Sequence, residues 1–446
     1  MRHYIEQLTR QVPNLFWNFV EQGAVTGVSR LLLFPIAAHL VGKGEFGLFA
    51  TALSAVLIIG VNPANGLAVG LLRNMSRYGE DQQRKLVRTA LGLSCKLIIA
   101  VVVALLFISS IMYYERFFDV KTYLCVIFLG MSLYAENQIM LVMTPLRFRR
   151  QFKSRSLWYL AASLATAFMG VVGCAIGGVV GLAAGMMLSN YLLYFLAQRR
   201  FREPHVTPQA ELATVLKGVW FHMTLAGMLV QAGPHLNRIV LRIFWDNEAV
   251  ADLFAATGIV YLFVTPVSNS GALLLSMISK YNSVKEISRN TYRLILGMMV
   301  ALGAGGMLFF YFLSPLMLRL LFPGFGNRAV GLFPILIWMI PANFVIAFVR
   351  PLITKFAKVA WIPTINFSVL LLIIVLMFSL VPKWGLIGAA YSICIGNVAE
   401  AVLRLVVFAM IYHGRQRDDQ DDKGAETPPP SDARNLISRP ADTCDA

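Results

Sequence analysis

Apolar stretches long enough to cross a bilayer recur along almost the whole chain. Of its 446 residues 57% are hydrophobic and only 14% are charged, whereas a soluble domain carries about 25% charged residues. A helix of about 20 apolar residues spans the hydrocarbon core. The apolar runs are continuous rather than alternating, which excludes a transmembrane barrel of strands. The sequence therefore predicts an all-α, multi-pass integral membrane protein.

We expect twelve transmembrane helices. They lie at residues 12–41, 46–72, 87–113, 121–146, 156–174, 177–198, 215–244, 250–279, 293–321, 330–353, 359–381 and 385–412. Most of the 39 lysines and arginines, Arg350 among them, fall in loops on the same side of the membrane as the N-terminus. The positive-inside rule then places both termini in the cytoplasm. The net charge of +16 is thus a topology signal, and nucleic acid is not expected as a partner.

The two halves of the chain resemble each other. Gly178–Ala183 and Asn190 are matched by Gly385–Ala390 and Asn397, with the same separation for both pairs. We therefore expect two six-helix lobes, at residues 1–207 and 208–413, related by an axis along the membrane normal with a cavity between them. Residues 414–446 are rich in Asp and Pro and predict a disordered cytoplasmic tail.

Two lone arginines lie at matching places in these halves. Arg30 and Arg238 each interrupt a long apolar stretch. An arginine at the bilayer centre costs about 2.5–3.5 kcal/mol on insertion scales, so such residues usually face a water-filled cavity. Two cationic side chains in one cavity indicate an anionic cargo.

The seventh helix carries the most specific polar pattern. Gln231, His235, Arg238 and Arg242 are spaced four, three and four residues apart, which places them on one helical face. Lipid cannot solvate this face, so we expect it to line the cavity. For Arg242, which is close to Trp245, the alternative is that its side chain extends to the membrane interface.

Other charged residues within the spans allow two interpretations. Lys96 either lines the same cavity or extends to the interface. Glu21 and Glu136 are candidates for ion or proton coupling, although an interfacial position for Glu21 and helix packing for Glu136 explain them equally well. Glu400 and Arg404 are four residues apart and predict an ion pair within one helix.

The sequence contains no catalytic or cofactor motif. HExxH, P-loop and GxSxG patterns are absent, so we expect neither an enzyme nor a bound cofactor. The five cysteines form no CxxC pair and are expected to pack in the helices rather than to bind metal or form disulfides. They are Cys95, Cys125, Cys174, Cys394 and Cys444.

Three segments resemble a known family. Residues 30–35 followed by 40–50 resemble its opening, a long apolar helix and then an LGxxxFGxxA pattern, with Val41 at a leucine position. Residues 237–241 resemble its Asp-Arg-apolar segment, with asparagine in place of the aspartate, and residues 385–390 resemble its GxxGAA motif. The chain thus resembles the Wzx-type polysaccharide transporters of the MOP flippase superfamily.

This resemblance implies alternating access between two six-helix bundles in the bacterial inner membrane. The implied cargo is an undecaprenyl-diphosphate-linked oligosaccharide, flipped during surface polysaccharide biosynthesis, with a polymerase and glycosyltransferases as possible partners beside membrane lipids. Arg30, Arg238, Arg242, His235 and Gln231 would then contact the cargo. A cation-coupled multidrug exporter and a non-transporting scaffold of a glycan assembly complex are the alternatives.

Overall fold

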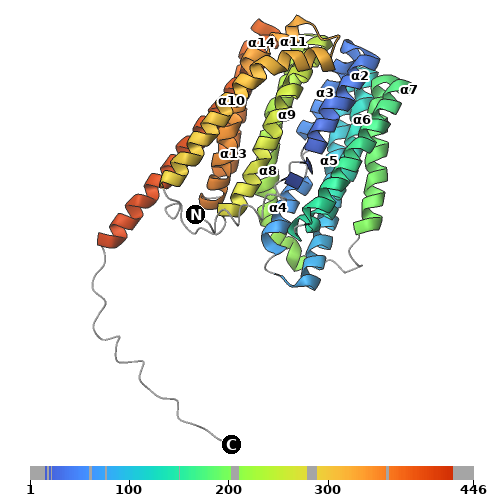
Figure 1. Ribbon diagram of the computed structural model, residues 1–446. Coiled ribbons are helices and arrows are strands. Elements are labelled where there is room, and N and C mark those ends of the chain that lie inside the picture. The colour runs from blue at the N-terminus through green and yellow to red at the C-terminus, as the bar shows by residue number, and fades with distance from the viewer. Residues whose placement is uncertain are drawn as a thin grey trace, which may run out of the picture.

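The computed structural model describes residues 16–17, 20–21, 23–59, 63–75, 78–149, 151–201, 210–278, 289–357 and 361–424. These residues form a bundle of long helices joined by short turns (Figure 1). The helices are η1 (Ala24–Leu33, a π-helix), α2 (Phe34–Val41), α3 (Lys43–Ile59), α4 (Pro63–Met75), α5 (Glu80–Tyr114), α6 (Val120–Phe148), α7 (Phe152–Phe201), α8 (Ala210–Phe244), α9 (Asn247–Ile278), α10 (Arg289–Leu321), α11 (Asn327–Val330), α12 (Phe333–Leu336), α13 (Met339–Phe356) and α14 (Trp361–Gly424).

The two longest helical stretches each turn back on themselves. The 50 residues of α7 would extend about 75 Å at 1.5 Å per residue, far more than a bilayer core of about 30 Å. The backbone leaves the helical conformation at Gly178, with φ of 59°, and at Gly385 in α14, with φ of 53°. Glycine adopts this left-handed conformation without a steric penalty. Each stretch therefore crosses the membrane twice, and each of the twelve expected spans contains a helix.

The outer surface of the bundle is apolar. Large hydrophobic side chains are exposed on α5, α7, α10 and α14, among them Phe107, Phe168 and Phe312 at 67%, 70% and 71%. Eight helical stretches, with α7 and α14 each counted once, are long and apolar enough to cross a membrane. An exposed apolar belt of this kind is stable only against lipid. The chain is a multi-span membrane protein, as the composition predicts.

The two halves of the chain meet closely at the upper end in Figure 1, where α3 and α9 begin. The Lys43 ammonium lies 2.8 Å from a carboxylate oxygen of the fully buried Asp252 and 3.7 Å from Glu248. Phe46 packs against Phe254 and Phe325 with ring centroids 5.4 and 6.2 Å apart. Charged and aromatic contacts thus hold this end of the molecule closed.

The last helix is longer than the sequence indicates. α14 continues to Gly424, so residues 414–424 are helical where we expected the disordered tail to begin. This segment is polar, with aspartates at 418, 419, 421 and 422, but it contains no helix-breaking proline. The preceding helix therefore propagates through it. Residues 425–446 lie outside the described part of the chain.

The closed end depends on a glycine. A side chain at Gly47 would overlap the backbone carbonyl of Asn247, whereas one at Gly44 would meet nothing within 4 Å. We therefore expect Gly47→Val, but not Gly44→Val, to force α3 and α9 apart. Carbodiimide coupling of the Lys43 amine to the Glu248 or Asp252 carboxylate, quantified by peptide mass spectrometry, measures this separation. Equal coupling yields in both variants would contradict the prediction.

Candidate functional site

A cavity of about 370 Å³ lies mainly within the second half of the chain, where η1 of the first half borders it. Its wall is formed by η1, α8, α9, α13 and α14. Apolar residues of α8, α13 and α14 form part of this wall, among them Leu229, Ile346 and Ile373. The polar lining residues are Thr26, Arg30, Gln231, His235, Arg238, Tyr261, Thr265, Asn343, Arg350, Asn366, Asn397 and Glu400. The cavity is thus an apolar cleft with converging polar groups, the usual form of a small-molecule site.

Arg238 on α8 is held by neutral groups alone. Its guanidinium donates hydrogen bonds to the hydroxyls of Ser54 and Thr257 at 3.4 and 3.2 Å, and contacts Nδ1 of His235 at 3.3 Å. The same group lies 4.5 Å from the centre of the Phe254 ring. Only 3% of the residue is exposed. Within the described residues no carboxylate lies at ion-pair distance from it, so its charge is oriented but not neutralised.

Arg30 approaches the same region from the first half of the chain. It lies in the π-helix η1, a rare conformation that is found frequently at functional sites. Its guanidinium donates to the backbone carbonyl of Gly258 at 3.2 Å and lies 5.2 Å from the centre of the Tyr261 ring. Both contacts are made with α9 of the second half. This arginine therefore also keeps its charge without a carboxylate partner among the described residues.

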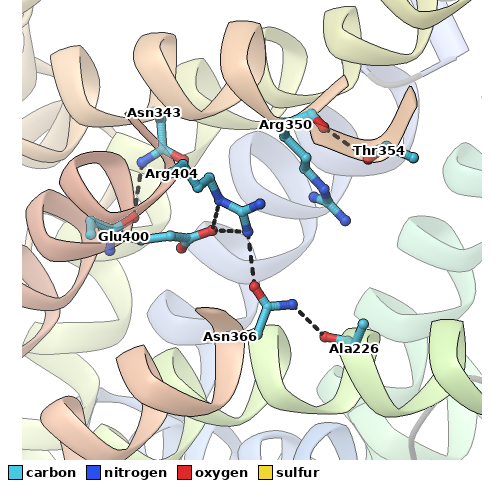
Figure 2. A network of polar contacts seen from close by, with 8 residues as sticks. Ala226, Asn343, Arg350, Thr354, Asn366, Glu400 and Arg404 are labelled. Carbon is cyan, nitrogen blue, oxygen red and sulfur yellow. Dashed lines mark hydrogen bonds and ion pairs between the residues drawn. The ribbon is translucent and has the colours of Figure 1, made fainter. Parts of the chain in front are cut away.

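A third arginine and a carboxylate line the part of the wall formed by α13 and α14 (Figure 2). Arg350 of α13 is exposed to the cavity. Glu400 of α14 accepts a hydrogen bond of 2.9 Å from Nε of Arg404, which is completely buried. Arg404 also donates to the Asn366 side chain at 2.8 Å. The ion pair predicted from the four-residue spacing is confirmed.

The balance of these charges is positive. Glu400 is the one carboxylate among the lining residues that the structure describes, and the buried Arg404 compensates its charge. The charges of Arg30 and Arg238 remain uncompensated within the described structure, whereas Arg350 has the Glu400 carboxylate as an electrostatic neighbour. Coulomb interactions are strong at such a site, because the surrounding apolar protein screens them much less than water does. The cavity is suited to bind an anion.

No family model and no curated protein matches the sequence. The outward-facing form of a multidrug resistance MATE family transporter of the MOP superfamily is 13% identical over 89% of this chain and 95% of its own, with a TM-score of 0.69. Lipid II flippase MurJ in an inward closed conformation is 13% identical over 96% and 93%, with a TM-score of 0.66. The chain has the MOP-superfamily transporter fold.

A third solved structure shares this MOP fold. It is a MOP superfamily transporter from Pyrococcus furiosus whose binding pocket is described as reversed in polarity, 14% identical over 90% of this chain and 94% of its own, with a TM-score of 0.59. These three proteins are transporters or flippases rather than enzymes, in agreement with the absence of catalytic motifs. The fold expected from the family resemblance is confirmed, whereas the Wzx branch stays a prediction.

Within this MOP fold, the predicted cargo-contacting residues separate into two groups. Gln231 and His235 line the cavity together with Arg30 and Arg238. Arg242 is half-buried near the end of α8 and Lys96 is exposed on α5, and neither is among the residues that line the cavity. Arg242 follows Arg238 by one helical turn, and this offset carries it past the cavity.

The two candidate carboxylates have different surroundings. Glu21 is buried and lies 3.0 Å from a guanidinium nitrogen of Arg155, at the start of the chain's described part. Glu136 on α6 accepts hydrogen bonds from the Ser132 hydroxyl at 3.0 Å and from the Asn190 amide at 2.7 Å. Neither carboxylate lines the central cavity. Glu136 therefore has neutral partners, whereas Glu21 has a cationic one.

Arg350 was not expected to be a site residue. We counted it among the loop cations although it lies inside the predicted span at 330–353. In the structure it lies within α13, Met339–Phe356, and lines the cavity. The signal that could have identified it is its helical spacing of seven residues from Asn343, two turns along one face.

The buried Arg404 should depend on Glu400 for stability. Removing one member of a buried ion pair typically costs about 3–5 kcal/mol, because the remaining charge loses its partner. We expect Glu400→Ala to lower the unfolding temperature in detergent, and the further change Arg404→Leu to restore much of the loss. Glu80→Ala, which removes an exposed partner of Arg84, is the control and should have no measurable effect. Equal losses for the two glutamate variants would contradict this account.

Proposed function

We propose that the protein is a flippase that translocates an undecaprenyl-diphosphate-linked oligosaccharide across the bacterial inner membrane during surface polysaccharide biosynthesis. The observation that carries the proposal is the uncompensated charge of Arg30 and Arg238 in the central cavity. Lipid II flippase MurJ, whose fold is similar, is by its description a flippase of a lipid. The sequence motifs that resemble the Wzx-type transporters support the same function.

A diphosphate fits the chemistry of this cavity. It carries about two negative charges, and guanidinium groups bind phosphate oxygens through paired, charge-assisted hydrogen bonds. The volume of about 370 Å³ is close to the lower end of the range for small-molecule sites, about 300–1,000 Å³. It suits the head group and its nearest sugar rather than a long glycan. The prenyl tail would remain in lipid.

Alternating access follows from the arrangement of the two halves. We infer from the distribution of basic residues that both termini are cytoplasmic, which places the contact between Lys43 and Asp252 at the periplasmic end. Release of the cargo on that side requires this contact to break while the opposite end closes. The chain would then function as two six-helix lobes, at residues 1–207 and 208–413, that rock about the central cavity.

Glu136 is our candidate for coupling to an ion gradient. Its carboxylate is bonded to a hydroxyl and an amide rather than to a cation. Such a group can bind a proton or a small cation without first breaking an ion pair. Glu21 is less suited to this role because Arg155 compensates its charge.

A multidrug exporter is the second candidate function. The similar MATE transporters are described as multidrug resistance proteins, and their fold is shared by this chain. An organic cation, however, would require an uncompensated carboxylate in the cavity, and Glu400 is already paired with Arg404. A scaffold that does not transport gains nothing from uncompensated charge in the membrane. Contact with a polymerase or with glycosyltransferases is compatible with the flippase.

Arg30 and Arg238 should be required for transport. Charge-assisted hydrogen bonds contribute about 1.5–3 kcal/mol, so Arg30→Ala and Arg238→Ala should each reduce transport at least about tenfold. Arg242→Ala, on the same helix but outside the cavity lining, should have little effect. The measurement is mass spectrometry of lipid-linked sugars, together with surface glycan, in cells that carry only the variant. Loss of transport should appear as accumulation of the completed lipid-linked oligosaccharide.

The outcome distinguishes the two candidate functions. Normal surface glycan in cells with a well-expressed Arg238→Ala variant would contradict the flippase. If those cells instead became sensitive to cationic drugs, the multidrug exporter would be supported.

Glu136 should be required for coupling to an ion gradient but not for cargo binding. Glu136→Gln retains the hydrogen-bonding shape but not the titratable charge, so binding of a prenyl diphosphate should be unchanged while transport loses its response to an imposed pH or sodium gradient. Proteoliposomes under each gradient provide the measurement. The control is Glu80→Gln, an exposed carboxylate at the start of α5. A gradient response equal to that of the unmodified protein would exclude Glu136 from coupling.

A further inference from the structure

The wall of the cavity formed by α13 and α14 differs chemically from the region around Arg30 and Arg238. Arg350 and three asparagines line it together with Glu400 (Figure 2). Among the described residues, the other two arginines donate to a backbone carbonyl and to two hydroxyls, and no carboxylate lies at ion-pair distance from them. A carboxylate oxygen repels a phosphate, so an anion has little reason to bind beside Glu400. The two regions are therefore suited to different parts of a ligand.

The polar groups of this wall are fixed by one another. Arg404 donates to both Glu400 and Asn366, and Asn366 in turn donates to the backbone carbonyl of Ala226 on α8 at 3.1 Å. Asn343 donates to the Asn397 side chain at 3.0 Å. The first set of contacts thus links α8 to both parts of α14, and the second links α13 to the second part of α14. A rigid arrangement of this kind lowers the entropic cost of binding a polar ligand.

Both donors and acceptors remain available after these bonds are made. Glu400 uses Oε1 for Arg404, and its other oxygen, Oε2, has no partner among the described residues. Asn343 uses its amide nitrogen twice, which leaves its carbonyl oxygen. The Arg350 guanidinium has no hydrogen-bond partner in the described part of the chain. Hydroxyl and amide groups can donate and accept at once, and this mixture of groups matches them.

We propose that this wall is a sugar subsite, in which Arg350 donates to, and Glu400 and Asn343 accept from, the uncharged sugar nearest the diphosphate. The inference rests on the proposed function, because it assumes that a diphosphate occupies the region of Arg30 and Arg238. It adds a recognition step: the diphosphate supplies general affinity for prenyl-linked cargo, whereas the sugar subsite selects which glycan is carried.

The test compares two probes on the purified full-length protein in nanodiscs. One is farnesyl diphosphate, and the other is the same lipid diphosphate carrying a single sugar, prepared as a panel of hexoses and N-acetylhexosamines. We expect at least one sugar to increase the affinity about tenfold. Arg350→Leu and Asn343→Ala should each abolish most of this increase while changing the affinity for farnesyl diphosphate less than about threefold. Arg319→Leu, an exposed arginine on α10, should leave both affinities unchanged.

The outcomes separate the inference from the function on which it rests. If no sugar increases the affinity, or if Arg350→Leu weakens both probes equally, the sugar subsite is wrong and Arg350 is at most another phosphate contact. The flippase proposal survives both results. If neither probe binds the unmodified protein, the flippase proposal fails and the sugar subsite fails with it. Two independent variants protect the test against a folding defect in either one.

Discussion

Positive charge without a counter-charge, held inside a membrane protein, is the constraint on which the rest of the structure depends. Lipid cannot solvate a guanidinium, and a carboxylate that neutralised it would remove its use for an anionic ligand. Arg238 resolves this conflict through Ser54, Thr257 and His235, which orient the side chain with neutral groups. The helices of both halves must meet at this point to supply those groups. The central cavity is the consequence.

The two halves have corresponding hydrogen bonds, but one corresponding position is a carboxylate in the first half and an amide in the second. The Glu136–Asn190 hydrogen bond of the first half and the Asn343–Asn397 bond of the second join residues equally far apart in the sequence. The left-handed glycines Gly178 and Gly385 are as far apart in the sequence as Glu136 and Asn343. The first half therefore has a carboxylate where the second has an amide that lines the cavity. We expect ion coupling at this position in the first half, whereas the corresponding position of the second half contributes to cargo binding together with Arg30 and Arg238.

Much of the fold could be predicted because lipid imposes simple rules on sequence. Continuous apolar runs located the helices, including the two separate spans within each of α7 and α14. The helical spacing of Gln231, His235 and Arg238 identified one wall of the cavity, and the spacing of Glu400 and Arg404 identified their ion pair. Each of these inferences depends on neighbours within one helix, where geometry is known in advance.

The remaining features depend on which helices lie side by side. Nothing in the sequence indicates that Arg30 reaches the carbonyl of Gly258, or that Lys43 is paired with Asp252. The periodicity of α8 included Arg242, and only packing against other helices decided that the cavity ends before it. The sequence by itself determined the membrane-spanning class, the helices and the sign of the buried charge, since these follow from composition and local spacing. The tertiary structure decided which charges are compensated, because compensation depends on distances between residues far apart in the chain.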